Sequence, residues 1–195
     1  MSPSVPESAA GGRAAGLVAV FDRLAAQQRE MAALIAEGNG ALAARAEAVS
    51  GWSVAQQLEH LGLTGNRVLD AVDAILRDPA TPPRGRPNPA GWLLLLTGRI
   101  PRGRIKTRDE WAPPDSSPER ARQGVAALTE RTAALAARAG ELAAGLATRA
   151  HPVLGQFDAR RWLRFLVIHQ DHHLRLVHDI RGANGLPPRP SEARP

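Results

Sequence analysis

The residues best suited to chemistry in this sequence are His169 and His173, four positions apart near the C-terminal end. Read as a helix, the stretch 158–180 places both on a hydrophobic stripe with spacings of three and four. The other members of that stripe are Trp162, Phe165, Leu166, Leu176 and Ile180. A buried imidazole without a partner costs about 1–3 kcal/mol, whereas two neutral imidazoles on one helix face can bind one metal ion at about 2.0–2.1 Å. The spacing therefore predicts a metal-binding pair, and two core histidines satisfied by neighbouring groups are the alternative.

The other four histidines have weaker patterns. His60 lies in a second predicted helix, outside its hydrophobic stripe by roughly half a turn, so spacing alone does not aim it at the pair. His172 lies about 80° from the stripe and is predicted at the surface or behind the ligands. His178 falls on the opposite face and is expected in solvent, and His151 precedes a proline in a predicted turn.

Several other kinds of site are excluded or left open by composition. The chain has no cysteine, which excludes disulfides, thiolate zinc sites and a protein thiol nucleophile. Glu59 and Asp171 each adjoin a candidate histidine, but neighbours on a helix point about 100° apart, so neither is an obvious ligand. Metal ligation requires neutral imidazoles, whose pKa is ordinarily about 6.5, so metal affinity is expected to fall as the pH drops through that region.

Four long amphipathic helices are predicted to position these residues. The first begins near Arg13 and breaks at Gly38, and a capping box at Ser53 starts the second, which runs to about Arg77. The third is expected from 117 to about 147 and the fourth from 158 to 181, with a short apolar helix at 88–96. No strand pattern is evident. With long connections between the helices, this favours an antiparallel bundle over residues 13–182, flanked by a disordered tail at 1–12 and a mobile Pro/Arg-rich tail at 183–195.

The net charge of +6 permits an acidic partner without requiring one. The basic segment Arg99–Arg108 is interpreted as a solvated loop, and binding of an anionic substrate or of nucleic acid is the alternative. No aromatic residues interleave the segment and no nucleic-acid-binding motif accompanies it. Nucleic acid is therefore disfavoured as a partner. The run Trp92–Leu96 is far shorter than the ~20 residues of a membrane helix and is expected to pack on the bundle. The expectation is a soluble, cytoplasmic protein with no membrane partner and no secretory leader.

Two segments resemble the DinB/YfiT-like superfamily. The first is Trp52-Ser53 followed by Leu58, His60 and Leu61, and the second is His169-x-x-His172-His173. Residues His151–Gly155, Trp162–Phe165 and Ile100–Gly103 are similar to a DinB-like branch of unknown function. One difference is Leu176, where many members have a glutamine three residues after the last histidine.

This resemblance implies a DinB/YfiT-type four-helix bundle in which His60, His169 and His173 hold one divalent metal, with zinc the first choice and nickel or iron alternatives. It also implies a metal-dependent hydrolase, or an S-transferase that uses a low-molecular-weight thiol, acting on a small-molecule substrate. Homodimerisation is a further expectation from the family. The alternative is a non-catalytic interaction or stress-related bundle with a structural metal or none, and whether the protein is an enzyme is left open.

Overall fold

The computed structural model describes residues 7–78, 85–102, 111–113, 115 and 117–187. Its elements are α1 (Glu7–Ala36), α2 (Asn39–Ala43), α3 (Val54–Arg77), α4 (Pro89–Thr97), α5 (Pro118–Ala136), α6 (Ala139–Ala144), β1 (Thr148–His151), β2 (Gly155–Asp158) and α7 (Ala159–Ala183). The all-α expectation is therefore confirmed in its coarse form. The expectation of no strands is wrong, because β1 and β2 pair as an antiparallel hairpin. Each strand has only four residues, which is too short for alternation to stand out in the sequence.

The predicted helix starts are present. Ser53 and Gln56 form the reciprocal capping box of α3, and the side chains of Asn88, Ser117 and Asp158 cap α4, α5 and α7. Helix α1 begins at Glu7, earlier than expected. The third predicted helix ends at Ala136, and α6 forms a separate short helix.

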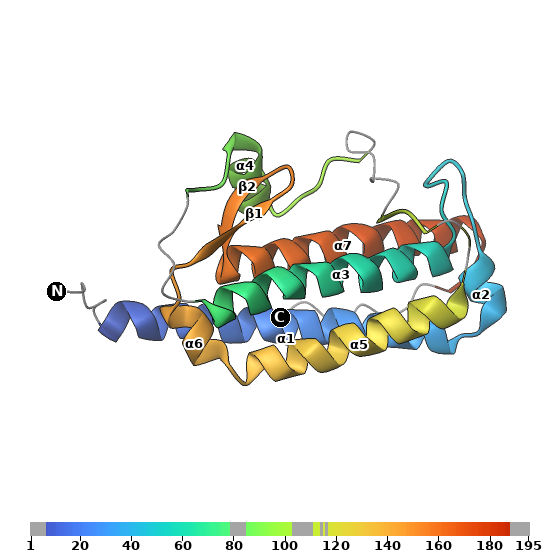
Figure 1. The fold of residues 1–195 in the computed structure, drawn as a ribbon. Helices are drawn as coiled ribbons and strands as arrows, with labels where there is room; N and C mark the ends of the chain where they lie inside the picture. Colours follow the sequence, from blue (N-terminus) through green and yellow to red (C-terminus); the bar gives the residue numbers. More distant parts are fainter. Residues whose placement is uncertain (1–6, 79–84, 103–110, 114, 116, 188–195) are drawn as a thin grey trace.

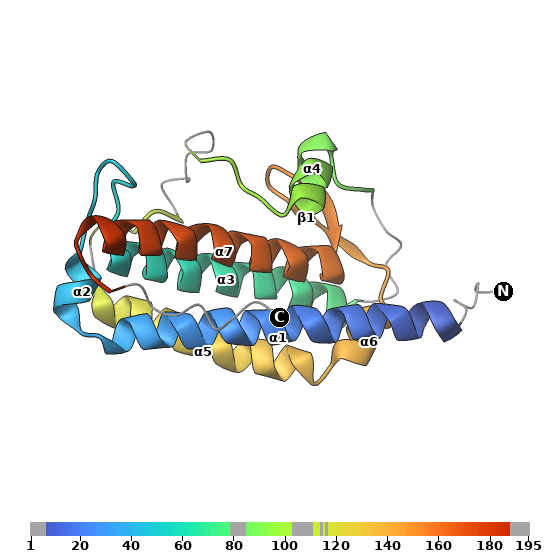
Figure 2. The ribbon, with the colours of Figure 1, turned by 180° about the vertical axis from the view of Figure 1, so that it is seen from behind.

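The four long helices α1, α3, α5 and α7 lie side by side (Figures 1 and 2). Contacts between α3 and α5 advance together along both helices, from Gly62 against Gly124 to Asp73 against Arg131. These two helices therefore run in the same direction, which corrects the expectation that all neighbours are antiparallel. The long connection between α3 and α5 carries the chain back along the molecule before α5 begins. Helices α3 and α7 are antiparallel, since His60 faces His169 while Gln57 faces His173.

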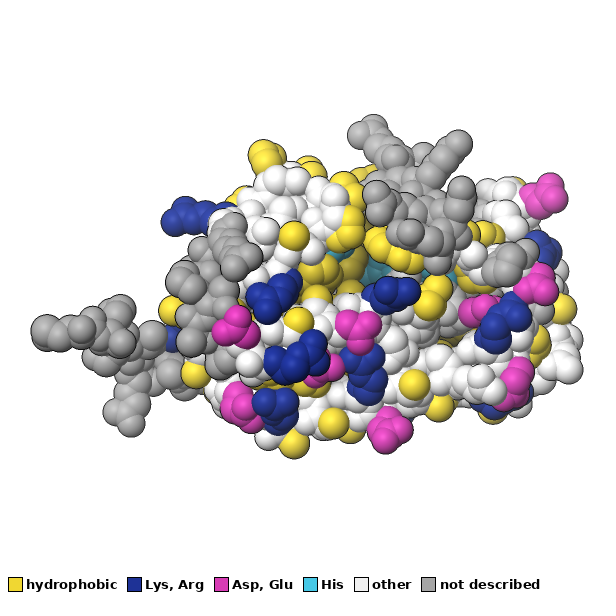
Figure 3. All heavy atoms as spheres, in the orientation of Figure 1, with side chains coloured by type: hydrophobic (Ala, Val, Ile, Leu, Met, Phe, Trp, Pro, Cys, Tyr) yellow, Lys and Arg dark blue, Asp and Glu magenta, His cyan; other side chains and the backbone are white. Residues whose placement is uncertain are grey.

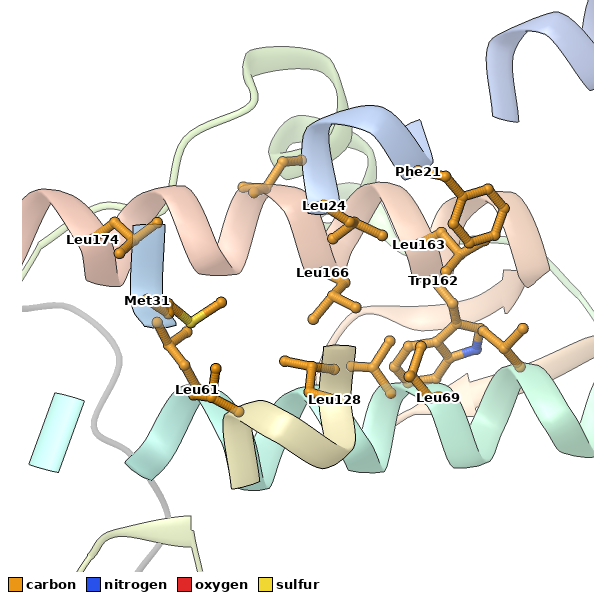
Figure 4. Packing of buried hydrophobic residues seen from close by; sticks show 14 of the residues in the cluster. Phe21, Leu24, Met31, Leu61, Leu69, Leu128, Trp162, Leu163, Leu166 and Leu174 are labelled. Carbon is orange, nitrogen blue, oxygen red and sulfur yellow. The ribbon is translucent and has the colours of Figure 1, made fainter. Parts of the chain in front are cut away.

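The core between the long helices is made mainly of leucine side chains, with other aliphatic and aromatic residues and Met31 among them (Figure 4). Leu24 and Met31 of α1, Leu61 of α3, Leu128 of α5 and Leu166 of α7 are all fully buried. Helices α3 and α5 approach closely through glycine, because a Cβ added at Gly62 would lie 2.8 Å from a backbone carbon of Gly124.

A small lobe made of α4 and the hairpin lies on the outer side of the bundle, over α7 (Figure 1). Backbone hydrogen bonds join its two parts, from Asn88 N to Leu154 O at 3.0 Å and from Gln156 N to Arg86 O at 3.0 Å. Gly155 has a φ of 85°, and a Cβ there would meet Asn88 N at 2.6 Å, so glycine permits this docking. The expectation that Trp92–Leu96 packs on the bundle is half correct, since only Leu94 and Leu95 are buried.

Candidate metal centre

Three histidines converge between α3 and α7. His60 of α3 is 2% exposed and His173 of α7 is 7% exposed, and His169 lies one turn before His173. Each ring offers a nitrogen, and these three atoms lie within 4.8 Å of one another. The Nε2 atoms of His60 and His169 are 3.3 Å apart. The structure therefore brings together the three residues predicted as ligands.

Hydrogen bonds on the outer nitrogens orient two of these rings. The Nδ1 atom of His60 lies 2.8 Å from the carbonyl oxygen of Trp111, and that of His173 lies 2.6 Å from Oε1 of Gln57. Gln57 uses its amide nitrogen to donate to Ser50 Oγ at 2.9 Å, which fixes its oxygen on the histidine side. A carbonyl or amide oxygen only accepts hydrogen bonds, so each Nδ1 carries the proton. In the neutral ring, Nε2 then keeps its lone pair, which is the form that binds metal.

The surroundings also keep the imidazoles uncharged. Burial lowers the pKa of His60 to about 4, although the Trp111 carbonyl acts in the opposite direction, and charge on His172 lowers it further. Burial lowers the pKa of His169 and His173 well below the ordinary value, and the neighbouring histidines add to this effect. At neutral pH all three rings are therefore neutral.

The spacing of the nitrogens fits a shared cation. Two nitrogens bound to one tetrahedral ion at about 2.0–2.1 Å lie about 3.3 Å apart, and the observed separation of His60 and His169 is 3.3 Å. The donor set is entirely imidazole, which suits zinc, nickel and iron. The residues present fit a divalent transition metal.

The other histidines lie around this group rather than in it. His172 is half-buried, with its ring edge-on to that of His173 at 5.1 Å. His178 was expected in solvent, but it is half-buried and its Nε2 lies 2.5 Å from Glu30 Oε1. Helix α7 packs against α1 on that side, so the face opposite the histidine stripe is also covered.

Aromatic side chains extend from the histidine group to the hairpin. Phe165 lies 5.6 Å from His169 and 4.7 Å from His151, measured between ring centroids. Nδ1 of His151 accepts hydrogen bonds from the backbone amides of Val153 and Leu154, both at 3.2 Å. The neutral ring therefore carries its proton on Nε2, and burial lowers its pKa to about 4. His151 was expected in a turn, but it is the last residue of β1, and the turn comprises residues 152–154. It presents a neutral N–H donor next to Phe165.

The acidic neighbours do not support the ligands. Asp171 is paired with Arg23 and Gln27, and Glu59 is paired with Arg120. The groups that hold the outer nitrogens are instead Gln57 and the backbone of Trp111, which the sequence analysis did not identify. Gln57 could have been found, because it precedes His60 by three residues and so shares its helix face. No sequence pattern indicated the Trp111 carbonyl, because the spacing of side chains carries no information about backbone groups.

These features define a mostly helical protein with a three-histidine group between two long helices, in which His60 and His173 are buried and His169 is half-buried. Residues 23–177 match the family model of the DinB superfamily, and the chain belongs to this superfamily. The comparisons with curated proteins and with solved structures found no match. Among the described helices, none is long and apolar enough to cross a membrane.

Proposed function

We propose that this protein is a metal-dependent enzyme in which His60, His169 and His173 hold one divalent cation, with zinc preferred and nickel or iron as alternatives. We further infer that its long helices form the four-helix bundle typical of the superfamily. The observation that carries the proposal is the inward direction of the Nε2 lone pairs of His60 and His173, whose outer nitrogens are both engaged. Proteins commonly orient metal-binding histidines in this way.

Three protein ligands favour catalysis over a closed structural site, because they leave a coordination position for another molecule. When bound, such an ion lowers the pKa of a water molecule or of a thiol, which favours a hydrolase or an S-transferase. Since the chain has no cysteine, the thiol would be a free, low-molecular-weight one. The substrate would be a small molecule.

The chain's own residues would bind and orient that substrate. Trp52 and Phe165 flank the histidines, with ring centroids 5.1 Å from His60 and 5.6 Å from His169 respectively. These surfaces suit an apolar or aromatic substrate and keep water away from it. The Nε2–H of His151 would donate to an oxygen of the substrate.

Metal content tests the proposal. The untagged protein, reconstituted with zinc, nickel or ferrous iron, is expected to bind one ion per chain by elemental analysis. Alanine substitution of His60, His169 or His173 should abolish binding, whereas His172→Ala, on the same helix but outside the group, should retain it. Sub-stoichiometric metal that reconstitution does not restore would refute the proposal.

One observation favours the alternative of a non-catalytic bundle. The 3.3 Å between Nε2 of His60 and Nε2 of His169 also suits a direct hydrogen bond, so the pair can hold together without metal. A protein that binds one ion but turns over no member of a panel of thiols, esters and electrophiles would support a structural metal. A protein that neither binds metal nor changes its melting temperature on His60→Ala would support no metal at all.

A further inference from the structure

Helix α4 has a hydrophobic face on the outer side of the lobe. Trp92, Leu93 and Leu96 are 47%, 61% and 82% exposed. Successive residues of a helix turn by about 100°, so these three positions fall within one arc of about 100°. Leu94 and Leu95 point the other way and are buried.

The hairpin extends this surface. Val153, in the turn between β1 and β2, is 56% exposed, and its carbonyl oxygen accepts from Asn88 Nδ2 at 2.7 Å, so the turn is fixed beside the start of α4. We call Trp92, Leu93, Leu96 and Val153 the lobe face. Figure 3 shows hydrophobic side chains at the outer surface of this lobe and basic side chains nearby. Single exposed apolar residues are ordinary, but a group rimmed by polar residues marks an interaction site.

The positive charge of the chain is concentrated in the part of the sequence that contains this helix. Residues 79–108 contain no Asp or Glu and seven basic residues, whereas the rest of the chain contains 18 basic and 19 acidic residues. The whole positive balance of the protein therefore belongs to the segment that contains α4. Of the basic residues whose placement is described there, Arg86 and Arg99 are exposed and adjoin the two ends of α4, whereas Arg102 is paired with Asp179 of α7 at 2.6 Å. Arg161 of α7 lies over the Trp92 ring, 5.2 Å from its centroid.

We propose that the lobe face docks onto the surface of an anionic lipid bilayer. Trp92, Leu93 and Leu96 would enter the boundary between headgroups and acyl chains, where tryptophan is favoured. Arg86 and Arg99, at the two ends of α4, would contact lipid phosphates. The two contributions act together, since neither a short apolar helix nor a basic segment alone binds a membrane firmly.

Charge argues against the other occupants. A second copy of this chain would bring two acid-free basic segments together, and like charges repel. Nucleic acid would satisfy the arginines but would leave Leu93 and Leu96 without apolar partners. Surface binding differs from the expectation of no membrane partner, which rested on the lack of a membrane-spanning segment. It is independent of the metal site.

Vesicle co-sedimentation of the full chain tests the proposal. Binding to phosphatidylcholine vesicles that contain phosphatidylglycerol should exceed binding to phosphatidylcholine alone by at least about tenfold and should weaken with salt. The double variant Leu93→Ser/Leu96→Ser should lose at least about tenfold in affinity. The matched control is Val18→Ser/Leu146→Ser, which removes two apolar side chains that are 53% and 49% exposed elsewhere and should bind normally. Circular dichroism checks that all variants are folded.

Two further measurements report on the face itself. Arg86→Gln/Arg99→Gln should reduce binding and its salt dependence. Vesicles should shift the tryptophan emission to the blue, and Trp92→Phe should remove that shift.

Three outcomes would overturn the proposal. One is vesicle binding that Leu93→Ser/Leu96→Ser leaves unchanged, or that neutral vesicles match. Another is a concentration-dependent dimer in sedimentation equilibrium that the same double variant dissociates, which would make the lobe face an interface between copies. The last is duplex DNA that binds more tightly than the anionic vesicles and displaces them.

Discussion

Gln57 offers a sharp test of the metal site, because it touches the site only through a ligand. Its Oε1 lies 2.6 Å from Nδ1 of His173, and its side chain is 0% exposed. In Gln57→Leu, Nδ1–H of His173 loses its acceptor, and the buried leucine prevents water from replacing it. The ring is then free to rotate or to change tautomer, and Nε2 no longer faces inward in a fixed way.

Partners of this kind are worth about tenfold to a hundredfold in metal affinity, which corresponds to about 1.4–2.8 kcal/mol. Because this contact is fully buried, we expect Gln57→Leu to fall at the upper end. Gln57→Glu keeps an acceptor at the same place, so its affinity should equal or exceed that of the wild type. The metal-free Gln57→Leu protein should also lose about 1–3 kcal/mol of stability from the unpaired N–H.

The assay is competition for zinc against a chromophoric chelator, with urea unfolding of the metal-free proteins alongside. Gln28→Leu is the matched control, since Gln28 is 2% exposed and donates to Thr132 Oγ1 at 2.8 Å between α1 and α5. It should lose stability without losing metal affinity. If Gln57→Leu is folded and its zinc affinity stays within about twofold of the wild type, below the range for such partners, the orienting role of Gln57 is wrong.

Three other predictions follow from the same contacts. The metal-free protein should lose stability as the pH falls from about 6.5 to about 4, because unfolded histidine takes up its proton near 6.5 whereas His60 does so at about 4 in the folded state. The loss amounts to about 3 kcal/mol for His60 alone. Urea unfolding at intervals across that pH range measures it. His151→Phe keeps the ring packing but removes the N–H donor, together with the Nδ1 acceptor of the Val153 and Leu154 amides. Turnover of any substrate found should fall about a hundredfold at unchanged metal content, and unchanged turnover would exclude the donor role. Gly62→Ala should lower the free energy of unfolding by about 1–3 kcal/mol, since its Cβ would meet the backbone of Gly124. Gly140→Ala, with no atom within 4 Å, should not, and equal effects of the two would refute the close-packing argument.

The pH prediction also revises the sequence-based one. Sequence alone placed the loss of metal affinity near pH 6.5, the ordinary pKa of histidine. Burial lowers the pKa of His60 to about 4 and those of its two partners well below the ordinary value. Proton competition for these nitrogens is therefore expected to begin at a lower pH, and metal retention at pH 5 is compatible with an all-histidine site.

The sequence predicted the α7 half of the site more securely than the α3 half. His169 and His173 could be recognised because α7 has one clear hydrophobic stripe and both residues lie on it. His60 lay outside the stripe of α3, yet it is 2% exposed. The reason is that α3 packs against both α5 and α7, so its buried face is wider than a single stripe. For His60, the family motif was a better guide than periodicity.

Contacts that depend on chain path could not be predicted in this way. The Trp111 carbonyl reaches His60 only because the connection before α5 passes over α3. The parallel direction of α3 and α5 depends on the same connection, whose length permitted either direction. Of the Arg99–Arg108 loop, residues 103–108 lie outside the described part of the chain, and the solvated-loop expectation for them stays a prediction.

The distribution of N–H protons over the three imidazoles gives the strongest reason for a cation. Each neutral imidazole has one N–H, and His60 and His173 have placed theirs on outer acceptors. Only His169 can supply a proton to the interior, and it can donate to one neighbour at a time, such as Nε2 of His60 at 3.3 Å. Without metal, at least one inward nitrogen lone pair therefore needs a hydrogen-bond donor from outside the three histidines. Protonating a second nitrogen of one ring would supply such a donor, but burial opposes the charge. A divalent cation would accept all three lone pairs at once, which would account for the engaged outer nitrogens of His60 and His173.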